Sequence, residues 1–411
     1  MKFIYQTGIF LYVYAVKLVS LFNGKAKSWV TGRKNIWQQL QSLPSFSGTT
    51  VWVHCASLGE FEQGRPVMES IKKQFPDTRI VLTFFSPSGY EPRKNYNTAD
   101  AVFYLPADLP GAAARFYDAV KPDMGLIVKY EFWQGYLHEA HKRQIPLFLI
   151  SGIFRKDMPF FKSYGNYFRS GLKAFEHFFI QDGNSLQLLQ SIGLNNVTVC
   201  GDTRLDRVLE AVEKRTAIPL IQKFKNNKLL WICGSTWPVD DSLIIPTAKK
   251  LKGKLKILLV PHDIHKEYID KTIRENPSLS FVKFSEPGNT DITNADVLIL
   301  DTMGMLTSAY AYADFVYVGG GFGKAVHNTM EPAAYGVPVL FGPNHLKFTE
   351  IGGLMEVHGG ICISHAQDMQ YYVESMNSPE ERAHIGKAAR KYVEDHSGAT
   401  PIIIDQIRSK F

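Results

Sequence analysis

The chain contains little cysteine and no cysteine motif. Its 411 residues include four cysteines, which are far apart and form no Cys-x-x-Cys pair. This excludes a disulfide scaffold and a cysteine-rich zinc site, and it agrees with a reducing cytosol. Low-complexity segments and short-period repeats are also missing. With 45% hydrophobic and 21% charged residues, the composition excludes a disordered or collagen-like chain.

A strong excess of either charge is absent as well. Lysine and arginine number 46 and aspartate and glutamate 39, so the net charge is +7. This mild basic excess suits an anionic partner, such as a phosphorylated metabolite, a nucleic acid or a membrane surface, without choosing among them. The length predicts two or three domains.

The one long apolar run lies at the start of the chain. Residues 3–22 are about as many as a helix needs to cross a bilayer, and Gln6, Lys17 and Ser20 form a narrow polar stripe on the predicted helix. Such a helix either lies in the membrane interface or spans the bilayer at a tilt. The basic residues between 25 and 34 place the rest of the chain in the cytoplasm. A buried core helix is the alternative.

Short β-rich runs alternate with helical stretches along the rest of the chain. Most are continuously apolar, which is typical of strands covered on both faces of a parallel sheet. The predicted strands of the first half are 50–56, 79–84, 102–105, 125–128, 147–151, 178–181 and 197–201. Those of the second half are 229–233, 257–260, 282–284, 297–300, 315–318, 339–341 and 361–363. The predicted fold class is α/β, with two Rossmann-like doubly wound domains.

These runs predict five segments along the chain. They are a membrane-anchor helix (1–24), an N-terminal Rossmann-like domain (25–203), a polar linker (204–227) that looks like a helix followed by a connecting segment, a C-terminal Rossmann-like domain (228–378) and C-terminal helices (379–411). For the last segment, packing back on the first domain is one option. We expect the two domains to face each other across a cleft between their strand ends, where ligands bind in such folds.

A Ser-Leu-Gly-Glu motif follows the first predicted strand and opens a helical stretch. On spacing alone, Ser57 and Glu60 favour a capping box, with Ser57 as N-cap and Glu60 at the third helical position. The functional interpretation makes Glu60 a carboxylate at the mouth of the cleft, with Gly59 leaving room for a ligand. The two interpretations conflict, because a carboxylate held by backbone N–H groups is a weaker base.

Other strand ends in the first half carry further candidates. The turn with Ser88 and Gly89 can offer N–H groups to an anion. Glu131, two residues before Trp133, suits sugar binding. Arg155 is a candidate for phosphate contacts. An ordinary turn, a surface carboxylate and a solvated charge explain these residues equally well.

The second half has phosphate-binding patterns without a standard signature. Ser235 and Thr236 form a turn at a predicted helix start, which is a plausible phosphate cradle. His262 and His265 have the spacing of metal ligands, but no third ligand is evident, so contacts to an anionic ligand are preferred.

The segment 318–332 runs from a strand through four glycines, including Gly321, to Lys324 and a helix that we expect near Asn328. It matches neither the Walker A pattern nor the dinucleotide fingerprint. Its glycines still permit close backbone approach, and the helix N-terminus attracts phosphate. Glu331, one turn into that helix, can hold the hydroxyls of a ribose.

The order and spacing of these motifs resembles that of the 3-deoxy-D-manno-octulosonic acid (Kdo) transferases, which add Kdo to the lipid A precursor of lipopolysaccharide. Each motif is weak by itself, and the set covers essentially the whole chain. It comprises Ser-Leu-Gly-Glu (57–60), Glu-Phe-Trp (131–133), Gly-Ser-Thr (234–236), Pro-His (261–262), Asp-Thr-Met-Gly (301–304) and His-Asn-x-x-Glu-Pro (327–332).

The resemblance implies a GT-B fold and an inverting glycosyltransferase that moves Kdo from CMP-Kdo to the primary hydroxyl of a lipid A precursor. It implies catalytic roles for Glu60, as the base, and for Glu131. We expect donor contacts from Ser235, Thr236, His262, Gly321, Lys324, Asn328 and Glu331. We expect acceptor contacts from Ser57, Gly59, Ser88, Gly89 and Arg155. No metal, cofactor or nucleic acid is expected, and the chain is expected at the cytoplasmic face of the inner membrane.

Three motifs depart from the family pattern. The family's Pro-Arg-His reads Pro261-His262-Asp263, its Gly-Gly-His-Asn reads Ala325-Val326-His327-Asn328, and Met305 stands where a glutamate usually follows Asp-Thr-Met-Gly. We expect the polar role at position 305 to be lost. Two alternatives remain: another GT-B glycosyltransferase with a UDP-sugar donor, and a membrane-tethered nucleotide-sugar binder without turnover.

Overall fold

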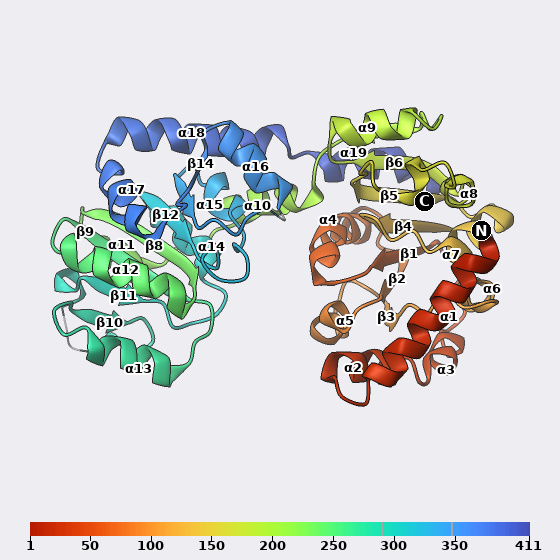
Figure 1. Ribbon diagram of the computed structural model, residues 1–411, viewed down its shortest axis with the longest axis horizontal. Coiled ribbons are helices and arrows are strands. Elements are labelled where there is room, and N and C mark those ends of the chain that lie inside the picture. Colours follow the sequence, from red (N-terminus) through yellow and green to blue (C-terminus); the bar gives the residue numbers. More distant parts are fainter. Residues whose placement is uncertain (289–290, 347) are drawn as a thin grey trace. The chain divides into compact units, whose positions relative to one another are not determined.

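The computed structural model describes residues 1–288, 291–346 and 348–411 and divides into two compact units (Figure 1). Unit 1 comprises Met1–Asp206 and His396–Phe411, and unit 2 comprises Arg207–Asp395. Each unit is built on one seven-stranded sheet in which all paired strands are parallel. The predicted α/β class with two doubly wound units is confirmed.

The sheet of unit 1 has the strand order β3-β2-β1-β4-β5-β6-β7, so the order reverses between β1 and β4. Its strands are β1 (Thr50–Cys55), β2 (Arg79–Phe84), β3 (Ala101–Tyr104), β4 (Met124–Val128), β5 (Leu147–Gly152), β6 (Phe175–Ile180) and β7 (Val197–Val199). Every residue of β1, β2, β4 and β5 is buried, which accounts for their continuously apolar sequences.

Helices cover both faces of this sheet and make two apolar clusters. One cluster contains Trp52, Phe116 and Tyr136, and the other contains Val53, Met68 and Ile403. The helices are α1 (Lys2–Val19), α2 (Gly24–Gly32), α3 (Ile36–Gln41), α4 (Leu58–Gln74), α5 (Pro87–Arg93), α6 (Ala112–Val120), α7 (Gln134–Arg143), α8 (Asn166–Leu172), α9 (Gly183–Gln190) and α19 (Ala399–Ile407). Through Ile403, the last helix of the chain therefore completes the core of unit 1.

The sheet of unit 2 has the order β10-β11-β9-β8-β12-β13-β14 and reverses between β8 and β12. Its strands are β8 (Leu229–Thr236), β9 (Leu255–Pro261), β10 (Phe281–Lys283), β11 (Val297–Ile299), β12 (Phe315–Val318), β13 (Val339–Phe341) and β14 (Gly360–Cys362). The main helices are α11 (Pro219–Lys225), α12 (Pro238–Lys250), α13 (Lys266–Glu275), α14 (Leu306–Ala309), α15 (Met330–Ala334), α16 (Thr349–Glu356), α17 (Met369–Ser375) and α18 (Pro379–Asp395).

Two segments differ from their predicted form. The polar stretch expected as a helix followed by a linker contains α10 (Thr203–Glu213) and, in addition, a second helix, α11. The helix expected near Asn328 begins two residues later, at Met330, and α15 has only five residues. The dipole of so short a helix contributes little at its N-terminus, so phosphate binding in this segment would depend on side chains and loop N–H groups.

Helix α1 is docked on unit 1 along one side. The Tyr5 hydroxyl donates to Asp108 (2.6 Å) and accepts the backbone N–H of Gln134 (3.1 Å). Tyr12 stacks on Phe85, with ring centroids 6.2 Å apart. On the rest of the helix large apolar side chains are exposed, among them Phe3, Phe10, Tyr14 and Leu18. Within the described residues, no helix has both the length and the apolar character needed to cross a membrane.

Candidate functional site

Two carboxylates of unit 1 follow the adjacent strands at which the sheet order reverses. Glu60 lies in the first turn of α4, after β1, and Glu131 lies just after β4. Parallel α/β sheets bind their ligands at the carboxyl ends of such strands. Burial raises the pKa of the Cys55 thiol, which ends β1, and the negative charges of both carboxylates raise it further. The topology therefore brings the two predicted catalytic residues to one edge of one sheet.

The Glu60 carboxylate is held by a neighbouring side chain. Ser57 is the N-cap of α4 and Glu60 is at the third helical position, as the spacing predicted. The Ser57 hydroxyl makes no capping bond to the helix backbone and instead donates to Oε2 of Glu60. The prediction of a reciprocal capping box, in which both side chains bond to backbone N–H groups, is therefore wrong. None of the described residues donates a hydrogen bond to Oε1 of Glu60, so this oxygen is available to accept a proton. The residue is 8% exposed.

Glu131 is positioned by an indole and faces a histidine. The Trp133 Nε1–H donates to Glu131 Oε2 at 2.8 Å. The same oxygen lies 3.6 Å from Nε2 of the buried His54. The other ring nitrogen of His54 lies 2.9 Å from the Thr83 hydroxyl, which fixes the ring plane. A carboxylate with two polar neighbours of this kind is oriented for one task rather than free to rotate.

The predicted acceptor residues are only partly brought together. Gly89 packs against the backbone of Ser57, where an added Cβ would lie 2.9 Å from the Ser57 carbonyl carbon. This close approach places Ser88 and Gly89, at the start of α5, beside the Ser57–Glu60 pair. At Gly59 an added Cβ would contact only the Ser57 hydroxyl, at 3.8 Å, so the space there is open. Arg155 is exposed, with its guanidinium 5.6 Å from the Tyr130 ring centroid.

In unit 2, Ser235 lies in a strained turn at the end of β8. Its φ is +53°, a left-handed value that is uncommon for residues other than glycine, and the register of β8 with β9 shifts at this point. Gly319, at the end of β12, packs on it so closely that an added Cβ would lie 2.4 Å from the Ser235 carbonyl oxygen. The His262 N–H donates to the Thr236 carbonyl at 2.8 Å. Strained backbone of this kind is concentrated at functional sites.

Three aromatic rings from the ends of β8, β9 and β12 stack at this edge. Trp237 and His327 lie side by side, with centroids 6.3 Å apart and ring planes 14° from parallel, and the His262 ring stacks over both, with its centroid 4.5 Å from each. Nε2 of His327 accepts the Trp237 indole N–H at 2.9 Å, which places the proton of a neutral imidazole on Nδ1. Burial, and then repulsion by His262, lower the pKa of His327, so this ring is neutral at pH 7. Exposed stacked rings suit a base or a sugar ring.

A buried aspartate organises the glycine-rich loop. Asp240, in the first turn of α12, accepts the backbone N–H groups of Trp237 and Gly320 (both 2.9 Å) and the Tyr317 hydroxyl (2.7 Å). Gly321 is buried against Gly342, where an added Cβ would lie 2.5 Å from the Gly342 nitrogen. The structure therefore explains these glycines by backbone packing, and it leaves Lys324 as the exposed member of the loop.

The remaining predicted donor residues form a small hydrogen-bonded group. Asn328 donates to Glu331 Oε1 at 2.9 Å and accepts the Met330 N–H at 3.0 Å. The Thr307 hydroxyl donates to Glu331 Oε2 at 2.8 Å. At the departure from the family pattern, the Met305 sulfur accepts the Thr302 hydroxyl at 3.1 Å, a weaker bond than a carboxylate would make. No group of three or more His, Cys, Asp or Glu side chains in the described part of the chain is arranged to hold a metal ion.

Several residues of these sites were missed by sequence reasoning. His54, Trp237 and Asp240 carry much of the geometry, yet each is a single residue in an ordinary context, and His327 belongs to a quoted motif but was given no role of its own. The usable signals were the position of His54 and Trp237 near the carboxyl ends of β1 and β8 and the motif that contains His327. Which of these side chains meet depends on strand order, which sequence periodicity does not reveal.

The two doubly wound units define the two-domain architecture of GT-B glycosyltransferases. The fold is similar to that of MurG from Acinetobacter baumannii, with a TM-score of 0.58 at 13% identity over 88% of this chain and 100% of that chain. It is also similar to UDP-GlcNAc 2-epimerase from Neisseria meningitidis, with a TM-score of 0.53 at 14% identity over 88% of this chain and all of that chain. At such identities the likeness concerns the fold alone.

Sequence relatives indicate which kind of glycosyltransferase this chain resembles. Residues 31–207 match the family model described as 3-deoxy-D-manno-octulosonic-acid transferase (kdotransferase). The chain is 27% identical over 372 residues to 3-deoxy-D-manno-octulosonic acid transferase from Haemophilus influenzae, covering 87% of this chain and 86% of that protein. It is 26% identical to the enzyme of the same name from Rickettsia bellii, covering 84% of both. The expected resemblance is confirmed: this chain is a glycosyltransferase related to the Kdo transferases.

Proposed function

We propose that this chain transfers Kdo from CMP-Kdo to the primary hydroxyl of a lipid A precursor, with inversion at the anomeric carbon. The observation that carries the proposal is the placement of Glu60 and Glu131 at the switch point of the sheet in unit 1, inside the segment that matches the Kdo transferase model. The relatives named for this activity match over most of the chain.

Glu60 acts as the general base in this proposal. Its Oε1 takes the proton of the acceptor hydroxyl as that oxygen forms a bond to the anomeric carbon, and the bond from that carbon to the CMP phosphate breaks. The Ser57 hydroxyl holds Oε2, so the basic oxygen keeps one direction. Glu131, fixed by Trp133, adds negative charge that favours an oxocarbenium-like transition state.

Unit 2 binds the donor in this proposal. The exposed ring of His262 stacks over Trp237 and His327 on one face, which supports contact of its other face with the cytosine or the sugar of CMP-Kdo. In this proposal Ser235, Thr236 and Lys324 contact the phosphate. Asn328 fixes the Glu331 carboxylate, which accepts ribose hydroxyls. Gly321 then contributes by shaping the loop, because it is buried.

We also propose that α1 lies in the cytoplasmic interface of the inner membrane and brings the enzyme to its lipid acceptor. Its docked side and its exposed apolar side chains support a helix that is held by the protein and in contact with lipid. The polar stripe predicted from the sequence is consistent with this placement.

The test compares donors with the lipid A precursor as acceptor. The purified full chain should release CMP from CMP-Kdo only when the acceptor is present, and it should not release UDP from UDP-N-acetylglucosamine. Transfer from the UDP-sugar would assign the chain to another GT-B activity. Binding of CMP-Kdo without any turnover would make it a nucleotide-sugar binder, and either result would contradict the proposal.

A further inference from the structure

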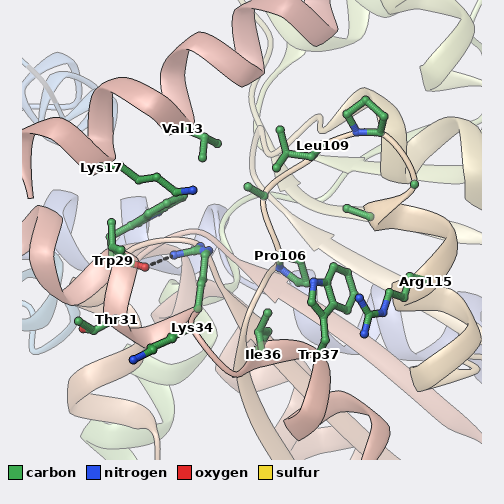
Figure 2. Close-up of a pocket in the computed structure, with 16 residues that line it drawn as sticks. Val13, Lys17, Trp29, Thr31, Lys34, Ile36, Trp37, Pro106, Leu109 and Arg115 are labelled. Atoms are coloured by element: carbon green, nitrogen blue, oxygen red, sulfur yellow. Dashed lines mark hydrogen bonds between the residues drawn. The ribbon is translucent and has the colours of Figure 1, made fainter.

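A cavity of about 730 Å³ lies in unit 1 beside the N-terminal helix. Its walls come from α1, α2, α3 and the segment that connects β3 to α6. Figure 2 shows Val13 and Lys17 reaching in from α1, with Trp37 and Arg115 on the opposite side. The size is that of a small-molecule site. None of the residues assigned to donor, acceptor or catalysis lines it, so it is a separate site.

The wall is positively charged without a balancing acid. It includes Lys17, Arg33, Lys34 and Arg115, and none of the described residues that line it is an aspartate or a glutamate. Lys17, Lys34 and Arg115 are exposed, and no carboxylate in the described ranges forms an ion pair with them. Net positive charge at a cavity raises the local concentration of anions.

Arg33 adds a fixed charge beneath this wall. Its guanidinium donates to the carbonyl oxygens of Phe85 (2.7 Å), Leu105 (2.9 Å) and Trp29 (3.2 Å), and it lies 4.0 Å from the Trp29 ring centroid. Burial lowers the pKa of Arg33 to about 9, so the group still carries its proton at pH 7. A buried cation that is held only by neutral groups leaves its charge available to an anion nearby.

Most of the remaining wall is apolar, and one of its polar atoms has no partner. The apolar members are Val13, Trp29, Val30, Ile36, Trp37, Pro106, Ala107, Leu109, Pro110 and Ala112. Trp29 is 7% exposed, and its indole N–H has no hydrogen-bond partner among the described residues. Because an unpaired buried N–H is costly, an oxygen acceptor bound at this wall would be favoured.

Exposed apolar side chains continue from the cavity along α1. Phe10 and Leu18 are 62% and 50% exposed, and Phe22, just beyond the helix, is 92% exposed. Exposed apolar groups beside cations are typical of surfaces that contact anionic bilayers. An occupant drawn from this side would combine an acyl chain with a phosphate.

We propose that this cavity binds one anionic phospholipid, with part of an acyl chain against the apolar wall and the phosphate attracted by the basic wall that Lys17, Arg33, Lys34 and Arg115 form. The inference rests on the proposed membrane attachment only for the source of the lipid. The exposed apolar side chains of α1 that are proposed to contact the bilayer, such as Phe10 and Leu18, do not line the cavity. The acceptor lipid has the same two chemical features, so the experiment must separate it from a bulk phospholipid.

The experiment measures binding of dihexanoyl-phosphatidylglycerol to the full chain by calorimetry, below the micelle concentration of this lipid. Two fragments serve as further probes: dihexanoylglycerol, which lacks the phosphate, and glycerol 3-phosphate, which lacks the chains. The whole lipid should bind at least about tenfold tighter than either fragment, because the site uses both features. Equal affinity for the lipid and one fragment would overturn the proposal.

Charge variants test the residues. Lys17→Gln with Arg115→Gln should weaken phosphatidylglycerol binding about tenfold or more, because two of the four positive charges of the wall are lost. Lys25→Gln with Lys173→Gln makes the same charge change at exposed positions that do not line the cavity, and binding should stay unchanged. Leu109→Trp should weaken binding by filling the cavity. Equal binding by the two double variants would overturn the proposal, and thermal melting confirms that each variant is folded.

Two further results separate this site from the proposed function. A lipid A precursor that binds in the cavity while phosphatidylglycerol does not would overturn the phospholipid assignment. Sedimentation with phosphatidylglycerol vesicles measures membrane attachment by itself. If the chain bound the short-chain lipid but did not sediment with the vesicles, the proposed role of α1 would be contradicted. The proposal of a phospholipid site would then still stand.

Discussion

Ser57 gives its hydroxyl to the Glu60 side chain instead of to the backbone of α4. The same two residues at the same spacing therefore serve a different purpose from the capping box that the sequence predicts. The pair lies in a closely packed part of the fold, because Gly89 approaches the Ser57 backbone there. Spacing alone cannot distinguish the two, since both keep Ser57 at the N-cap and Glu60 one turn later.

Asp241 is a buried carboxylate of unit 2 with a raised pKa, which gives a testable pH dependence of stability. Burial raises its pKa from 3.8 to about 6, although it accepts the Tyr268 hydroxyl at 2.6 Å. The folded state therefore binds a proton more tightly than the unfolded state, so stability falls as the pH rises from about 4 to about 6. At pH 7 the charged carboxylate costs on the order of 2–3 kcal/mol.

We predict that Asp241→Asn raises the melting temperature of unit 2 at pH 7 by several degrees and leaves it nearly unchanged at pH 4. The amide keeps an acceptor for Tyr268 and removes the buried charge. Melting curves at the two pH values, for wild type and variant, provide the measurement. A variant that melts lower than wild type at pH 7 would show that the charge is needed in the folded state.

At the scale of elements, α5 packs closely against the start of α4, beside Glu60. A Cβ at Gly89 would lie 2.4 Å from the Phe84 ring and 2.9 Å from the Ser57 carbonyl carbon. Gly89→Ala must push these elements apart, so we predict a loss of about 1–3 kcal/mol in unfolding free energy. Urea unfolding of wild type and variant gives the value.

The control for this prediction is Gly183→Ala, because a Cβ at Gly183, in α9, would meet no atom within 4 Å. That variant should be as stable as wild type or slightly more stable. If Gly89→Ala were as stable as Gly183→Ala, the close packing described for α5 would be wrong.

Elements also mark the limit of sequence reasoning. All the predicted strands are present, because strands buried on both faces have continuously apolar sequences that are easy to recognise. The surroundings of α15 were not predictable, since the Glu331 carboxylate accepts the Thr307 hydroxyl as well as the Asn328 amide, and only the fold brings Thr307 near. The stack of Trp237, His262 and His327 was missed for a related reason: it joins three strand ends far apart in the sequence.

At the scale of the whole molecule, the two sheets alone do not specify the chemistry. MurG and the UDP-GlcNAc 2-epimerases have a similar fold at low identity. We therefore infer the chemistry from the side chains near the carboxyl ends of the strands, with two carboxylates in unit 1 and stacked rings in unit 2. The sequence motifs predicted the carboxylates because these lie in short local patterns, and the relatives support the same activity.

The most direct test of this account is the turnover of Glu60→Gln with CMP-Kdo and the lipid A precursor. Loss of a general base predicts a fall in kcat of about 10²–10⁴-fold, with CMP still binding and the chain still folded. Glu69→Gln, on the same helix in a half-buried pair with Arg65, should keep wild-type kcat. Wild-type turnover by Glu60→Gln would contradict the account, because the proton of the acceptor would then go elsewhere.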